Sequence, residues 1–148
     1  MVSAGNRGGG LFVFSAVLFI LALGAVEEHV PGGPLYDIGD FTVTVDTEKD
    51  VYGSQELVRM SVVVDSPADL AGATISVQGI RPGNYAHINQ TRPVELKGGE
   101  NRFILIGRTP YCTSGCGGVY PGPYEVTAEL AIGGWAVSNS TTITLVSG

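Results

Sequence analysis

The only two cysteines of this 148-residue chain, Cys112 and Cys116, have three residues between them in a segment rich in Gly and Pro. The N-terminus, described below, indicates an exported protein. In exported proteins an even number of cysteines most often forms disulfides. So short a bridge closes a small loop, and we expect it to shape that loop and to stabilise the fold by only about 2 kcal/mol. Redox dithiols usually have C-x-x-C spacing at a helix start, and metal sites need further Cys or His ligands. We predict a structural disulfide, with redox and metal roles as alternatives.

Three acidic residues follow one another at alternate positions, as ligands do in the first half of a calcium-binding loop. They are Asp46, Glu48 and Asp50. The match then fails, because Val51 stands where the loop needs Gly and Leu57 stands where it needs a bidentate Glu. The pattern therefore favours a solvated turn between two strands, and calcium binding is the alternative. No other metal site is predicted.

Catalytic motifs are missing from the sequence. There is no G-x-S-x-G elbow, no H-E-x-x-H and no P-loop, and neither His29 nor His87 is near a Ser or Cys in a recognisable setting. Glu125 and Glu129 fall on the polar face of an alternating strand, where carboxylates are usually solvated. We predict a protein that is not an enzyme, with no catalytic residues and no cofactor.

Two N-glycosylation motifs are present, at Asn89 and Asn139. Asn139 shares its strand phase with Trp135 and Ile143, which are predicted to point inward. A modified asparagine has to reach solvent, so we expect either a β-bulge near Asn139 or an unmodified site, and the long polar run around it favours the bulge.

Period-two alternation positions these residues on β-strands. Strands are predicted over residues 41–46, 57–65, 73–77, 94–97, 102–107, 124–132 and 135–145, and residues 81–90 are ambiguous. The pairs Gly98-Gly99 and Gly133-Gly134 predict hairpin turns. Trp135, directly after the second turn, is expected to seal the end of the core. The pattern is typical of an all-β protein, an immunoglobulin-like (Ig-like) antiparallel β-sandwich of about seven strands, with a small closed barrel as the second choice.

The N-terminus carries an uncharged, strongly apolar run over residues 8–26, between Arg7 and two glutamates. As a helix it would be about 28 Å long, enough to span a bilayer core. Small residues near position 24 also suit signal-peptidase cleavage, so a signal peptide and a signal-anchor helix are both open. We predict a leader or anchor over residues 1–26, a Pro/Gly linker over 27–40 and an exported sandwich over 41–148.

The net charge of the chain is −6, and its eight basic residues are scattered singly. Phosphate-tracking surfaces need clustered Lys and Arg, so nucleic-acid binding is not expected. No polybasic patch is present either. We therefore expect membrane association to depend on an uncleaved N-terminal segment alone.

Two stretches resemble a known family. Residues 43–64 resemble the opening strands of alpha-macroglobulin-type and related Ig-like surface domains, with Asp46, Lys49, Tyr52 and Gly53 in matching places. Residues 121–145 look like their closing hairpin, and the cysteine segment is similar to loops of exported archaeal cell-surface domains. The macroglobulin thioester motif is absent, so the resemblance implies a fold and a compartment but no protease-trapping chemistry.

From these features we predict a non-enzymatic cell-surface structural or adhesion module, secreted or membrane-anchored. Its expected partners are proteins of the cell envelope or further copies of itself, because sheet edges and linkers suit such contacts. One alternative is a membrane-anchored accessory of an archaeal motility or pilus machine that binds the surface layer. Another is a hydrolase with a scattered carboxylate site.

Overall fold

A computed structural model of the chain describes residues 36–111 and 119–147. The chain divides into two compact units, Met1–Gly33 and Pro34–Gly148, and all described residues belong to the second. The predicted N-terminal helix, Cys112 and Cys116 therefore lie outside the described residues. None of the described residues belongs to a helix long and apolar enough to cross a bilayer.

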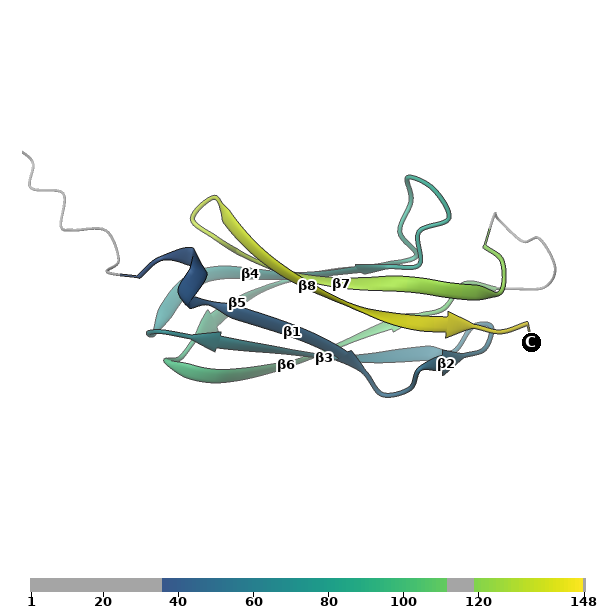
Figure 1. Ribbon diagram of the computed structural model, residues 1–148, viewed down its shortest axis with the longest axis horizontal. Helices are drawn as coiled ribbons and strands as arrows, with labels where there is room; N and C mark the ends of the chain where they lie inside the picture. Colours follow the sequence, from purple (N-terminus) through teal and green to yellow (C-terminus); the bar gives the residue numbers. More distant parts are fainter. Residues whose placement is uncertain (1–35, 112–118, 148) are drawn as a thin grey trace, which may run out of the picture. The chain divides into compact units, whose positions relative to one another are not determined.

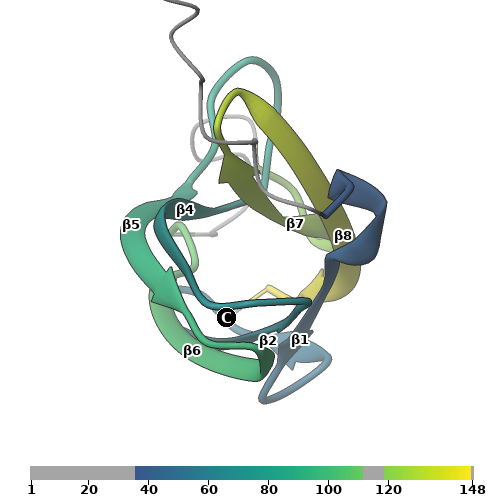
Figure 2. The same cartoon turned by 90° about the vertical axis from the view of Figure 1, so that its left-hand side faces the viewer.

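The described part is all-β, as predicted, apart from one short 3₁₀ turn. In chain order its elements are η1 (Ile38–Asp40), β1 (Thr42–Thr47), β2 (Val51–Tyr52), β3 (Leu57–Ser66), β4 (Leu70–Gly79), β5 (Ile88–Leu96), β6 (Gly99–Arg108), β7 (Gly122–Ile132) and β8 (Trp135–Leu145). The strands form a three-stranded sheet, β1-β3-β6, and a five-stranded sheet, β2-β8-β7-β4-β5. Figure 1 shows the two sheets face to face, and Figure 2 looks along the strands.

This topology is that of an Ig-like sandwich, and it differs from the prediction in the number of strands and in the direction of one strand pair. The described residues form eight strands instead of about seven, because Val51 and Tyr52, which lie in the predicted turn, form β2 at the edge of the five-stranded sheet. β2 runs parallel to β8 over two residue pairs, whereas the other strand pairs of the described chain are antiparallel. The prediction of an antiparallel sandwich is therefore wrong for the β2–β8 pair.

The core consists of the inward-facing residues of both sheets. On β3 the predicted inward set, which is Val58, Met60, Val62 and Val64, is completely buried. On β4 the predicted residues Ala73, Ile75 and Val77 are buried as well. On β3 and β4 the alternation of apolar and polar residues predicts burial correctly. Both strands lie inside their sheets, where the other sheet covers one face.

The turn at Gly98-Gly99 is present, but the predicted hairpin is wrong. β5 pairs with β4, and β6 pairs with β3, so the turn carries the chain from one sheet to the other. Asp69, in the β3–β4 connection, accepts hydrogen bonds from the Gly98 amide at 2.8 Å and from Lys97 Nζ at 3.1 Å. Two connections at the same end of the sandwich are thereby joined.

Candidate functional site

The cysteine segment starts directly after a well-ordered anchor. The Thr109 side chain is 1% exposed, and its hydroxyl donates to the Gly53 carbonyl at 2.7 Å and accepts from the Glu56 amide at 2.8 Å. These bonds attach the end of β6 to the β2–β3 turn. The predicted disulfide between Cys112 and Cys116 falls outside the described residues and stays a prediction.

The acidic residues of the calcium motif lie in a turn that is held by a local hydrogen bond and by a hydrogen bond from β8. The Asp46 carboxylate accepts from the Thr47 amide at 2.8 Å, and the Asp50 carbonyl accepts from the Thr144 amide at 2.7 Å. Asp46 and Glu48 share a shallow hollow with Arg59, whose positive charge opposes a bound cation. Within residues 36–111 and 119–147, no three acidic, His or Cys side chains gather closely enough to hold a metal ion.

Both glycosylation motifs lie on the surface of the five-stranded sheet. Asn89 is exposed on edge strand β5, and Asn139 is exposed on β8. The predicted bulge at Asn139 is wrong, because β7 and β8 pair without a register shift through the Ala128–Asn139 pair. Asn139 reaches solvent in a regular strand because three strands cannot cover all five strands of the opposite sheet, which leaves the inward phase of the outer strands open.

Trp135 differs most from the prediction. Its side chain was expected to seal the core, but it is 68% exposed. Trp135 does share the inward phase of β8 with buried Ile143, so the predicted phase was right. What the sequence did not indicate is that the first half of β8 extends beyond the covering sheet. The result is a large exposed aromatic side chain.

A tight hairpin turn fixes the position of this indole. Gly133 and Gly134 have φ angles of 54° and 88°, and Ile132 pairs with Trp135 across the turn. Two positive φ angles are what a two-residue type I′ turn requires, and only Gly accepts both without strain. The turn is short and regular, so Trp135 is presented on a rigid tip.

The opposite wall is formed by η1 and the residues next to it, which the sequence analysis assigned to a linker. Asp37 caps the turn: its carboxylate accepts from the Gly39 amide at 3.2 Å, while Asp40 accepts from the Asp37 amide at 2.9 Å. Tyr36 meets buried Phe41 edge-to-face with 5.4 Å between ring centroids. The Asp-x-x-Asp spacing of this capping box was the sequence signal that could have revealed a structured wall.

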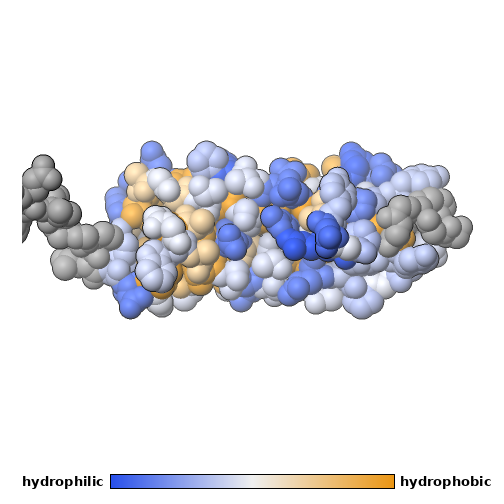
Figure 3. Space-filling model, turned by 90° about the horizontal axis from the view of Figure 1, so that it is seen from above, coloured by the Kyte–Doolittle hydropathy of each residue, from blue (hydrophilic) through white to orange (hydrophobic). Residues whose placement is uncertain are grey.

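Together these two walls enclose an apolar hollow of about 710 Å³ at the end of the sandwich where the described chain begins. We call it the Trp135 corner, and its lining residues are Tyr36, Asp37, Ile38, Phe41, Ile132, Gly133 and Trp135. Figure 1 places η1 and the β7–β8 hairpin at this same end, and Figure 3 shows apolar colours gathered there on the visible face. Asp37 is the one charged lining residue, so a ligand is held mainly by apolar and aromatic contact.

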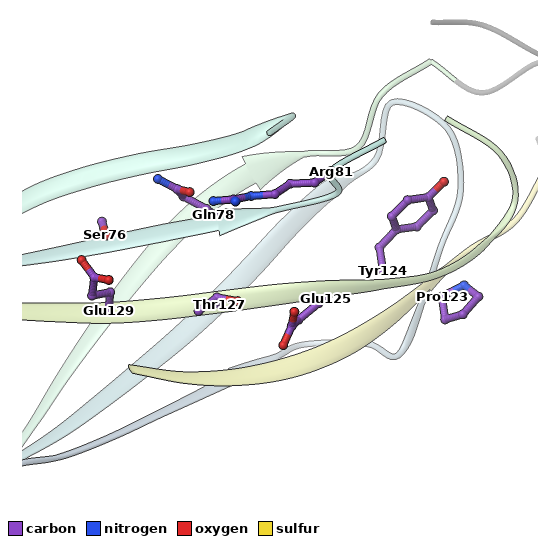
Figure 4. Close-up of a pocket in the computed structure, with 8 residues that line it drawn as sticks. All are labelled: Ser76, Gln78, Arg81, Pro123, Tyr124, Glu125, Thr127 and Glu129. Carbon is purple, nitrogen blue, oxygen red and sulfur yellow. The ribbon is translucent and has the colours of Figure 1, made fainter. Parts of the chain in front are cut away.

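A second hollow, of about 520 Å³, lies on the outer face of the five-stranded sheet and is polar. Figure 4 shows its lining: Ser76 and Gln78 from β4, Arg81 just beyond β4, and Pro123, Tyr124, Glu125, Thr127 and Glu129 from β7. These side chains alternate out of regular strands, so the hollow is a shallow groove along a sheet face. Glu125 and Glu129 are exposed in it, as the alternating pattern predicted.

The carboxylates with shifted pKa values lie away from this groove and have structural partners. Lys49 donates to the Glu56 carboxylate, which lowers the pKa of Glu56, and the Gly53 amide contributes further. The Gly98 amide and then Lys97 lower the pKa of Asp69. Both shifts favour ionised carboxylates and so stabilise turns. A hydrolytic acid would need the opposite shift, and the hydrolase alternative gains no support from these groups.

No protein-family model matches the sequence, and no curated protein matches it significantly. Solved structures do match. The CARDB domain of a Pyrococcus furiosus protein, crystallised in complex with di-metal ions, is 17% identical, with 74% of this chain and 94% of that chain covered and a TM-score of 0.51. The solution structure of the same domain covers 72% of this chain and 94% of its own, again with 17% identity and a TM-score of 0.51.

A sporulation control protein of Bacillus subtilis is 21% identical over 73% of this chain and 50% of its own, with a TM-score of 0.48. The similarity to CARDB domains shows the fold: this chain is a β-sandwich module of the Ig-like kind. At this identity it shows nothing more specific. The resemblance to alpha-macroglobulin-type domains and the export of the domain stay predictions.

Proposed function

We propose that this chain is a non-enzymatic module of the cell surface that acts through protein–protein contacts in the cell envelope. The observation that carries the proposal is the Trp135 corner, where a rigid hairpin presents an exposed indole beside an apolar hollow. Trp and Tyr dominate the binding energy of protein interfaces when a partner desolvates them. A hollow edged by Trp135 and Tyr36 is suited to accept an apolar side chain of a partner.

The position of the corner supports contact close to the site where the domain is attached. Tyr36 lines the corner and is also the first described residue, so the predicted leader or anchor joins the sandwich at this end. On this proposal the sandwich contacts envelope proteins through the end at which the predicted leader or anchor joins it.

The test uses a photo-crosslinking amino acid introduced at position 135 of the full-length chain in its native cells. Tyr85 is the matched control, because it is 67% exposed and lies in the β4–β5 connection at the other end of the sandwich. We expect protein adducts of defined mass from position 135 after irradiation and none of the same mass from position 85.

Adducts that appear equally from both positions, or adducts to lipid alone at position 135, would rule out a specific protein contact at the corner. After detergent extraction, the Trp135→Ala variant should also co-purify with less of the crosslinked partner than the Tyr85→Ala variant does. Equal co-purification by the two variants would count against the corner.

A further inference from the structure

The outer face of the five-stranded sheet carries a row of neutral polar side chains that begins at the glycosylation motif of β5. Asn89 on β5 pairs in register with Gln78 on β4, and Gln78 pairs with Thr127 on β7. Thr127 in turn pairs with Ser140 on β8, and the two hydroxyl oxygens are 2.9 Å apart. Side chains of residues directly opposite each other point to the same face, with about 5 Å between their Cβ atoms. The row therefore leads from Asn89 across the sheet on one face.

This row enters the polar hollow of about 520 Å³ described above, which we call the polar groove. Gln78 and Thr127 both line the groove, so Asn89 lies one strand away from it. Asn139 is placed differently. It pairs with Ala128, which is completely buried, and the Asn139 side chain therefore has the inward phase. Of the two glycosylation motifs, the one at Asn89 shares a face with the polar groove.

The polar groove brings together hydrogen-bonding groups that have no partner in the described part of the chain. Figure 4 shows the Arg81 guanidinium group turned back toward Gln78, with Glu125 and Glu129 on the neighbouring strand β7. Among residues 36–111 and 119–147, none of these four side chains makes a hydrogen bond or an ion pair. Their donors and acceptors are therefore open to a ligand.

The mixture of groups in the polar groove indicates the class of ligand. The carboxylates of Glu125 and Glu129 disfavour an anion, and the guanidinium group of Arg81 disfavours a cation. Amide, hydroxyl, carboxylate and guanidinium groups together suit a neutral ligand that donates and accepts hydrogen bonds at many points. A carbohydrate has this chemistry, because each of its hydroxyl groups is both a donor and an acceptor.

We infer that the polar groove holds the first sugars of an N-linked glycan carried by Asn89 of the same chain. A glycan attached there has to cross one strand spacing of about 5 Å to reach Gln78. A tethered ligand is present at a high effective concentration, so weak individual hydrogen bonds are enough to order it. The inference rests on export of the sandwich, which the proposed function also assumes, but it does not involve the Trp135 corner.

The test compares the protein purified from its native cells in a nonionic detergent with variants that lack one motif. Glycopeptide mass spectrometry should find a glycan on Asn89. Asn89→Gln should lower the midpoint of thermal unfolding by about 3 °C, because a glycan packed in the groove stabilises the folded state alone. Thr91→Val destroys the same motif without changing Asn89 and should have the same effect. Asn139→Gln is the matched control and should leave the midpoint unchanged.

Gln78→Ala tests the contact itself through a double-mutant cycle. The substitution should lower the midpoint by about 2 °C more in the glycosylated protein than in the Asn89→Gln background, where its partner is gone. Ser138→Ala, on the same face but outside the groove, is the control and should have equal effects in both backgrounds.

Two outcomes would overturn the inference and leave the proposed function standing. One is an unmodified Asn89 in protein that is exposed on the cell surface. The other is a Gln78→Ala effect of the same size with and without the Asn89 glycan. Retention of the sandwich inside the cell would contradict the export on which both proposals depend.

Discussion

The Tyr124 hydroxyl lies 3.0 Å from the backbone nitrogen of Tyr120 and 2.9 Å from its carbonyl oxygen. It accepts from the first group and donates to the second. Tyr124 stands near the start of β7, and a tyrosine there that binds the backbone a few residues upstream is the tyrosine corner of Ig-like sandwiches. Val126 stands two residues later, where antibody domains have their second cysteine, and it is fully buried. The domain keeps this corner of the fold without the disulfide between the sheets.

We expect Tyr124→Phe to lower the free energy of unfolding by about 1 kcal/mol, because two backbone groups lose their partner but remain close to water. Urea denaturation of wild type and variant measures the difference. Tyr85→Phe, whose ring is exposed and stacks edge-to-face on His87, is the control and should be neutral. A neutral Tyr124→Phe would show that the hydroxyl does not stabilise the β6–β7 connection.

Thr109→Val should destabilise the fold more strongly than its small chemical change suggests. The substitution keeps the shape of the side chain but leaves the Gly53 carbonyl and the Glu56 amide without the hydroxyl that serves both. Unsatisfied buried groups cost about 1–3 kcal/mol each, so a loss in this range is expected in urea denaturation. The same substitution at exposed Thr42 on β1 should be neutral or slightly stabilising, and equal effects at both positions would contradict the argument.

Stability should fall in acid partly through Asp69. Its folded-state pKa is lowered by the Gly98 amide and by Lys97, below the value of about 3.9 in the unfolded chain. The contribution is therefore fully present above that unfolded value and is lost as the pH falls through the folded-state pKa. Urea denaturation between pH 7 and pH 2.5 should show Asp69→Ala less stable at neutral pH, with the difference disappearing in acid. Asp69→Asn, which keeps an acceptor for Gly98, should be intermediate at neutral pH; a difference that persists unchanged at pH 2.5 would contradict this account.

Trp135 is the single tryptophan of the chain, so its fluorescence reports on the Trp135 corner alone. We expect the purified protein to emit at the long wavelengths of indole in water, with full access for acrylamide, and to shift to shorter wavelengths when a partner covers the corner. Trp135→Ala should change the free energy of unfolding by less than about 0.5 kcal/mol, because an exposed side chain contributes little to the core. Short-wavelength emission from the unbound protein would mean that the indole is buried.

The sequence predicted most of the fold where alternation coincided with burial. β3 and β4 lie inside their sheets, and their inward residues, such as Met60 and Ile75, are buried as expected. On the outer strands the alternation still predicted which side chains point inward, but it did not predict whether those side chains are buried. Asn139 on β8 and Gln90 on β5 both have the inward phase and are exposed, because phase depends on one strand whereas burial depends on what the other sheet covers.

For the candidate sites too, the sequence predicted local features but not those that depend on tertiary contacts. Motif spacing identified Asn89, Asn139 and the acidic turn as surface features, and the structure places all of the described ones there. The Trp135 corner was missed because it joins residues 36–41 with residues 132–135, which are close only after folding.

The amino-acid sequence by itself determined which side chains of each strand face one way and where the chain turns, since both follow from local backbone geometry and the chemistry of neighbouring residues. The tertiary structure alone decided which of those faces water. A three-stranded sheet cannot cover a five-stranded one, and Trp135 stands at the tip of the margin that stays uncovered.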